Sequence, residues 1–103
     1  MLGNYAETKF TTKLNQTFYL LLTTDINSTG FLVTQLLEDE YNNIDTFTDI
    51  RDAIKCYCKQ LEVIGDNVLF TIESSEFKNI ETTELINFKK EVELITEKNN
   101  LTL

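Results

Sequence analysis

The most regular pattern in the chain is a set of apolar residues separated alternately by three and four positions. The set comprises Phe47, Ile50, Ile54, Tyr57, Leu61 and Ile64. This spacing places all six side chains on one stripe of an α-helix. Thr46 is the predicted N-cap, with Asp49 three residues on, as in a capping box. Gly65 is expected to end the helix in a left-handed conformation.

A second helix is predicted from Thr83 to about Glu97. Its apolar residues repeat the same spacing, and they are Leu85, Phe88, Val92 and Ile95. Thr82 can cap the first turn through its hydroxyl group. The tail from Asn99 to Leu103 is expected to fray, as chain ends without docking contacts do.

Strands are predicted where β-branched and aromatic residues are concentrated. Residues 17–24 resemble a buried central strand, and residues 9–14 resemble a more polar neighbour. Residues 68–73 are predicted as a further strand, in which Val68, Phe70 and Ile72 alternate with the other three residues. Residues 31–37 fit either a strand or a helix. The polar segment 27–30 favours a hairpin loop and therefore a strand after it.

These elements occur in the order β-β-β-α-β-α within one domain of residues 1–103. The predicted fold is therefore of the α+β class. It has an antiparallel sheet of three to four strands, with both amphipathic helices packed on one face, where their apolar stripes are buried.

Composition excludes several functions. The chain has no His, which removes the commonest proton shuttle and metal ligand, and it contains no recognisable nucleophile system. Its 17 acidic and 9 basic residues give a net charge of −8, which disfavours nucleic acids and anionic membranes as ligands. We expect a protein without enzymatic activity and without a cofactor.

The remaining sequence features point to a cytoplasmic protein. The first residues lack the basic and apolar regions of a secretory signal, and Leu2 separates Met1 from Gly3, which excludes a myristoylation signal. The longest apolar run, from Phe18 to Leu22, is far shorter than the roughly 20 residues of a membrane span.

One segment resembles a calcium-binding loop. Asp25, Asn27, Thr29 and Gly30 occupy the first, third, fifth and sixth positions of an EF-hand pattern. The bidentate Glu that closes such a loop is replaced by Leu36, so the ligand ring stays incomplete. A hairpin loop is the better interpretation.

The two cysteines, Cys56 and Cys58, are predicted to be reduced structural thiols. Residues two apart on a helix point in nearly opposite directions, so the pair cannot hold one metal ion. Cys58 flanks the apolar stripe of the helix, whereas Cys56 is expected on the opposite, exposed face.

A glutamate and a lysine separated by one residue, Glu76 and Lys78, together with Asp66, resemble the acidic and basic residues of Mg²⁺-dependent nucleases. The spacing is common by chance and recurs at Glu7 and Lys9. A nuclease would also need a basic surface for its substrate. We therefore predict no metal site here.

An acidic segment is the strongest candidate for function. Six carboxylates fall between residues 38 and 52, and only Arg51 balances them. The residues are Glu38, Asp39, Glu40, Asp45, Asp49 and Asp52, with Tyr41 among them as an aromatic anchor. Asp45, Asp49 and Asp52 have the spacing of one helix face. Acids near a helix N-terminus also stabilise the helix and keep a small domain soluble, so a solvated face stays an open interpretation.

The alternative interpretation is a docking surface for a basic groove on another protein, where clustered carboxylates steer fast association. In composition and charge distribution the chain resembles small anti-restriction and anti-CRISPR proteins of phages and mobile elements. That resemblance implies an inhibitor that mimics nucleic acid and binds a nuclease or another nucleic-acid-binding enzyme. The second hypothesis is a structural or assembly protein that forms a homo-oligomer through apolar surface.

Overall fold

The computed structural model describes residues 2–27 and 29–101, which form five strands and two helices. In chain order they are β1 (Ala6–Thr12), β2 (Thr17–Thr24), β3 (Phe31–Leu37), β4 (Glu40–Phe47), α1 (Ile50–Gly65), β5 (Phe70–Phe77) and α2 (Thr83–Leu101). The α+β class, the antiparallel sheet and the two helices are confirmed. The order is β-β-β-β-α-β-α, so the prediction of three to four strands was one strand short.

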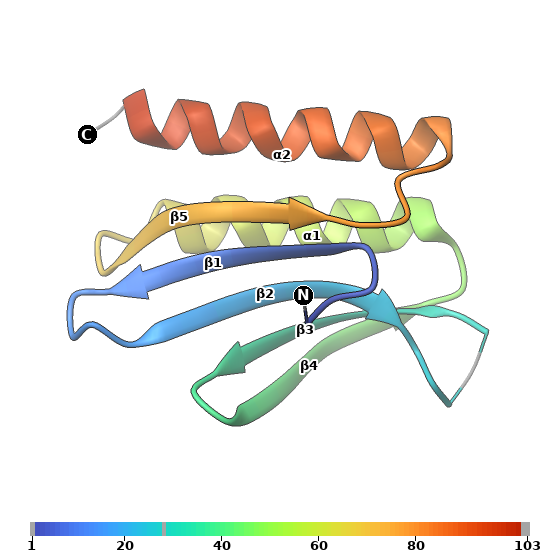
Figure 1. Ribbon diagram of the computed structural model, residues 1–103, viewed down its shortest axis with the longest axis horizontal. Helices are drawn as coiled ribbons and strands as arrows, with labels where there is room; N and C mark the ends of the chain where they lie inside the picture. The colour runs from blue at the N-terminus through green and yellow to red at the C-terminus, as the bar shows by residue number, and fades with distance from the viewer. Residues whose placement is uncertain (1, 28, 102–103) are drawn as a thin grey trace.

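All strand pairs of the sheet are antiparallel, and the strand order is β4-β3-β2-β1-β5 (Figure 1). The first four strands follow one another as hairpins. After α1, the chain returns as β5 to pair with β1. This order leaves β4 and β5 as the two edges of the sheet.

Strand β4 replaces the predicted start of the first helix. Phe47 pairs with Phe31 of β3, and Thr46 pairs with Leu32, so neither residue belongs to the helix. Helix α1 begins at Ile50 with Asp49 as its N-cap, because the Asp49 side chain accepts a hydrogen bond from the Arg51 backbone N–H at 2.9 Å. The Thr46 cap was therefore wrong.

The helix ends also differ from prediction. Helix α1 ends at Gly65, which does not have a positive φ, so the expected left-handed conformation is absent there. Thr82 does cap α2, since its hydroxyl accepts a hydrogen bond from the Leu85 N–H at 3.3 Å. Helix α2 continues to Leu101, beyond the predicted end at Glu97. Residues 102 and 103 of the predicted frayed tail lie outside the described residues.

The other strand predictions are confirmed with shifted ends. Residues 17–24 and 31–37 form strands with the predicted bounds, which resolves the ambiguity of 31–37 in favour of a strand. The first strand spans Ala6–Thr12 instead of 9–14, and the last spans Phe70–Phe77 instead of 68–73.

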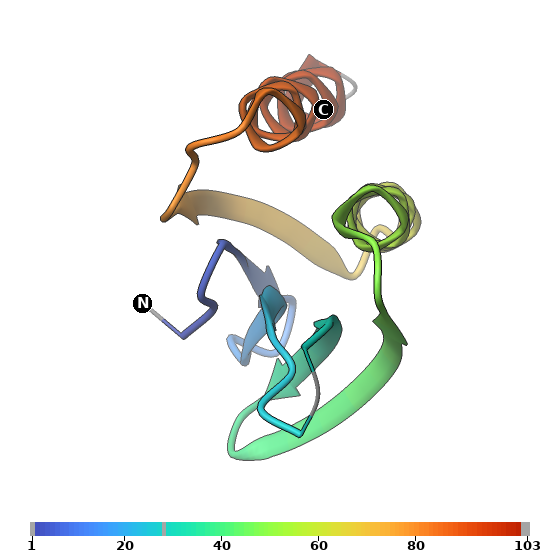
Figure 2. The same cartoon turned by 90° about the vertical axis from the view of Figure 1, so that its right-hand side faces the viewer.

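The core lies between the sheet and the helices. Helix α1 lies on the concave side of the curved sheet, and α2 packs beside α1 and β5 (Figure 2). The core takes alternate residues from β2, Leu20 and Leu22, whereas Leu21 between them is buried on the opposite face of the sheet. The largest fully buried apolar side chains are Tyr57, Phe10, Phe88, Leu20, Leu21, Leu22, Leu61, Val33 and Val92.

Tyr57 connects three elements of this core. Its hydroxyl group donates a hydrogen bond to the Leu20 carbonyl at 3.2 Å and lies 2.6 Å from the Thr8 hydroxyl. Its ring meets Phe88 of α2 edge to face, with centroids 5.2 Å apart. Burial raises the pKa of Tyr57, so the phenol stays neutral and bonded to the sheet.

Candidate functional site: the acidic edge of the sheet

The seven residues singled out from the sequence lie along one edge of the sheet. They are Glu38 and Asp39 in the turn before β4, Glu40, Tyr41 and Asp45 in β4, Asp49 just before α1, and Asp52 in its first turn. We call these seven residues the acidic edge. Strand β4 has eight residues, so the turn and the start of α1 are about 25 Å apart.

The predicted common helix face of Asp45, Asp49 and Asp52 does not exist. Asp45 lies in β4 opposite Val33, Asp49 is the N-cap, and only Asp52 is helical. The spacing was misleading because a strand and a helix meet between residues 47 and 50. The charges form an elongated row instead of a compact helical cluster.

Most of these carboxylates are directed to solvent. Asp49 is ion-paired with Arg51 at 2.8 Å, and the hydrogen bonds from Arg51 hold the pKa of Asp49 below its ordinary value. Among the described residues, the other five form no ion pair. Glu38 accepts a hydrogen bond from the Gln16 side-chain amide at 3.2 Å, which steadies it without neutralising its charge.

An edge position gives these acids a structural role as well. Within the described residues no strand lies beyond β4, and exposed edges invite pairing with other chains. Charged side chains on an edge oppose such pairing. This effect explains Glu40 and Asp45 in the strand, but it does not extend to Glu38 and Asp39 in the turn.

A shallow cleft adjoins the acidic edge where β4 begins. Its volume is about 380 Å³, and Phe18, Leu37, Glu40 and Tyr41 contribute to its walls. Tyr41 is 63% exposed, and Leu37, which pairs with Glu40, is exposed as well. The sequence did not identify Leu37 as a site residue, because the last apolar residue of a predicted strand is expected to be buried. Leu37 is exposed because it lies at the end of the strand.

The loop that resembles an EF-hand is a hairpin loop, as expected. The Asp25 N–H donates to the Gly30 carbonyl at 3.0 Å, and the Asp25 side chain accepts from the Asn27 N–H at 3.0 Å. Leu36 lies buried in β3. Ser28 within the loop lies outside the described residues.

Both cysteines are free thiols on α1. Cys58 is buried, as predicted, and burial raises its pKa to about 12. Cys56 was predicted to be exposed, but it is half-buried and packs against the core. Burial also raises the pKa of Cys56, so neither thiol is activated as a nucleophile.

The nuclease-like residues do not converge. Asp66 follows α1 next to the start of β5, whereas Glu76 and Lys78 lie at the other end of that strand. Across residues 2–27 and 29–101, no three metal-ligating side chains gather at one point.

Comparison with known proteins finds no matching family model, no matching curated protein and no matching solved structure. Within the described part of the chain, neither helix combines the length and apolar character that a membrane crossing requires. The geometry of the chain itself is therefore the basis for a functional proposal.

Proposed function

We propose that the protein is a non-enzymatic inhibitor that docks its acidic edge on a basic groove of a nucleic-acid-handling enzyme. The observation that supports this function is the placement of six carboxylates along one sheet edge, of which only Asp49 forms an ion pair within the described residues. An elongated anionic row fits a groove that evolved to hold a phosphate backbone. Its charges would accelerate association through long-range steering.

The cleft beside the row can supply binding energy that charge alone does not. Tyrosine is enriched among the residues that dominate interfaces, particularly next to apolar side chains that are covered on binding. Tyr41 and Leu37 are exposed and both line the cleft at Glu40. We expect the charged residues to govern the association rate and Tyr41 to govern the dissociation rate.

A charge-reversal experiment tests the proposal. The variant Glu38→Lys/Asp39→Lys/Glu40→Lys changes the net charge from −8 to −2, since each substitution adds two positive charges. The matched control Glu62→Lys/Asp66→Lys/Glu81→Lys makes the same change at exposed positions away from the acidic edge. Both variants are immobilised beside the wild type and exposed to host lysate, and bound proteins are eluted with duplex DNA.

We expect the wild type and the control to retain a nucleic-acid-binding enzyme from the lysate. Duplex DNA should displace this enzyme, and the edge variant should not bind it. Its association with the wild type should slow as salt increases, because the Debye length falls to about 8 Å at physiological ionic strength. Equal retention by the edge variant and the control would contradict the proposal.

The second candidate function is a homo-oligomeric structural or assembly protein. A specific observation favours it: the β1–β2 turn and the loop before β5 are joined by a hydrogen bond from the Lys13 N–H to the Leu69 carbonyl at 3.1 Å. These loops expose Leu14, Val68 and Leu69. We call these three residues the apolar tip.

A further inference from the structure

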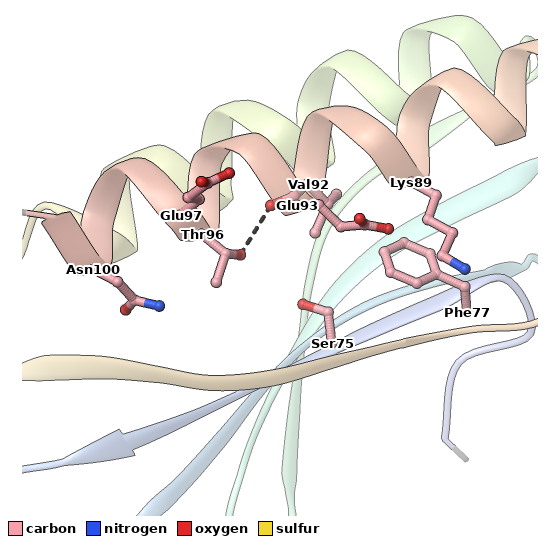
Figure 3. A pocket seen from close by; sticks show the side chains of 8 residues that line it. All are labelled: Ser75, Phe77, Lys89, Val92, Glu93, Thr96, Glu97 and Asn100. Carbon is pink, nitrogen blue, oxygen red and sulfur yellow. Dashed lines mark hydrogen bonds between the residues drawn. The ribbon is translucent and has the colours of Figure 1, made fainter.

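Strand β5 lies at the sheet edge opposite the acidic edge (Figure 1). Residues of β5 and α2 line a groove beside it. Its volume is about 590 Å³. Side chains from β5 point toward α2 across it, as Figure 3 shows. The residues used below are Ser75 and Phe77 from β5 and Val92, Glu93, Thr96 and Glu97 from α2.

The register of β1 and β5 shows which backbone groups face outward. The Lys78 N–H donates to the Tyr5 carbonyl at 3.0 Å, and Glu7 pairs with Glu76 two residues along. Hydrogen-bonded and non-bonded pairs alternate in an antiparallel ladder. The backbone groups of Glu76 therefore face β1, and those of Ser75 and Phe77 face away from the sheet.

The outward backbone groups have no backbone partner. Within residues 2–27 and 29–101, no strand lies beyond β5, and no backbone hydrogen bond forms on its outer side along Ser75–Phe77. Unpaired edge groups of this kind are a template for an added strand. Here they open beside a groove that can hold the side chains of such a strand.

The interior of the groove is mainly apolar. Phe77 is half-buried and packs against Phe88 with ring centroids 5.8 Å apart, and Val92 is fully buried beneath the groove. The Thr96 hydroxyl donates to the Val92 carbonyl at 2.9 Å within its own helix (Figure 3). The one proton of this hydroxyl is thus used within the helix. Side chains on the helix side of an added strand would be apolar.

Charge selects the occupant. Glu93 and Glu97 line the α2 wall, whereas Lys89 lies at one end with its ammonium group 5.8 Å from the centre of the Phe77 ring. A second copy that paired its Phe77 with Ser75 would place its own Glu76 directly opposite Glu76, on the face of the sheet away from α2, where a basic segment would place a lysine. Like charges in such proximity repel, so a basic partner fits and self-pairing does not.

We propose that the groove between β5 and α2 binds an extended basic segment of another protein, which pairs antiparallel with β5 through the backbone of Ser75 and Phe77. This mode is strand addition, in which main-chain hydrogen bonds supply affinity and side-chain pockets supply specificity. The proposal does not depend on the acidic edge, which lies on the opposite edge strand.

The test uses a capped peptide of about six residues, the length of an average strand, with alternating valine and lysine. In an antiparallel pair the residues that bond Ser75 and Phe77 also direct their side chains toward α2, so valine occupies those positions. One derivative is N-methylated at its valines, and its isomer is N-methylated at its lysines. Only the first loses the N–H groups that face β5.

We expect the valine-methylated peptide to bind at least about tenfold more weakly than the parent, because it loses two or more hydrogen bonds worth about 1 kcal/mol each. The lysine-methylated isomer should bind like the parent. Binding of the parent should slow hydrogen exchange at the Ser75 and Phe77 amides. The Glu76 amide, already bonded to β1, should change little. Equal binding of both isomers, unaltered exchange, or no binding of the parent would overturn the proposal.

A matched pair of protein variants tests the charge argument. Glu76→Lys should weaken peptide binding about fivefold, because a lysine of the peptide lies opposite Glu76, whereas Glu91→Lys should have little effect at physiological salt, because Glu91 lines a different cleft beside α1. The Glu38→Lys/Asp39→Lys/Glu40→Lys variant should bind the peptide normally, which separates this inference from the proposed function. Protection of Ser75 and Phe77 in a dimer without peptide would identify a second copy as the occupant and overturn the proposal.

Discussion

Glu38 has a left-handed backbone conformation, with φ of 56°, in the turn between β3 and β4. The other described non-glycine residues with positive φ are Asn15 and Asn79, and asparagine tolerates this region much better than glutamate does. A glutamate there costs roughly 1–2 kcal/mol. The hydrogen bond from Gln16 to Glu38 is exposed and offsets only part of this cost, which agrees with the proposed role of Glu38 in binding.

This leads to a prediction in which stability and binding change in opposite directions. Glu38→Asn should raise the free energy of unfolding by about 1 kcal/mol, because asparagine accepts the turn conformation more readily. The same variant should weaken binding to the proposed enzyme partner. Urea denaturation and surface plasmon resonance measure the two effects. Glu40→Asn, whose backbone has no positive φ, serves as the control and should not gain stability.

Cys58 makes stability depend on pH in the alkaline range. Its pKa is about 12 in the folded protein, against an ordinary value of 9.0, so the unfolded chain loses its proton first. The stability that depends on the protonated Cys58 thiol is therefore complete below pH 9. It decreases as the pH rises toward the pKa of Cys58 in the folded protein. Urea midpoints measured between about pH 8 and pH 10 should fall less steeply for Cys58→Ala than for the wild type. An unchanged slope would contradict this assignment.

At the scale of elements, a helix or strand could be predicted from the sequence when one of its faces is buried and the other is exposed. Helix α1 has one buried stripe, so its apolar spacing was visible from Ile50 to Ile64. Strand β4 is an edge strand whose residues are mostly exposed on both faces, so it shows no alternation of apolar and polar residues. Phe47 extended the helical spacing by coincidence.

The candidate site was recoverable only in part, for the same reason. The identity of the acidic residues follows from composition, and their exposure was expected. Their arrangement depends on the missed strand, which separates Glu40 from Asp49 along the edge. The groove beside β5 could not be predicted from the sequence, because its existence depends on how far α2 lies from the edge of β5.

The docking of α2 can be tested with one core residue. Phe88 contacts both Tyr57 and Phe77 and is fully buried, so Phe88→Ala should lower the free energy of unfolding by about 3–5 kcal/mol. Leu94 lies on the same helix and is 65% exposed, so Leu94→Ala should change it by less than about 0.5 kcal/mol. Equal effects in chemical denaturation would show that α2 is not packed as described.

At the scale of the whole molecule, the two candidate functions predict different masses in solution. The apolar tip exposes Leu14 and Val68 by 81% and 79%, but three side chains on loop ends form a small patch. A net charge of −8 also opposes self-association. We therefore expect the monomer mass of 11.9 kDa by size exclusion with light scattering at all concentrations.

The double variant Leu14→Ser/Val68→Ser should keep that mass and bind the proposed partner like the wild type. A concentration-independent oligomer in the wild type that this variant disperses would favour the structural or assembly function instead. Ser substitutions at these exposed loop positions should leave the fold intact.

The pairing of β5 with β1 also determines when the sheet can be finished during synthesis. Domains form as the chain leaves the ribosome, at roughly 5–20 residues per second. The hairpins from β1 to β4 and helix α1 emerge first. During this time one edge of β1 is unpaired, because its partner β5 lies more than half the chain away in sequence. For several seconds the nascent chain therefore carries its most buried strand as an edge, and this interval is when the protein is most exposed to aggregation and most dependent on chaperones.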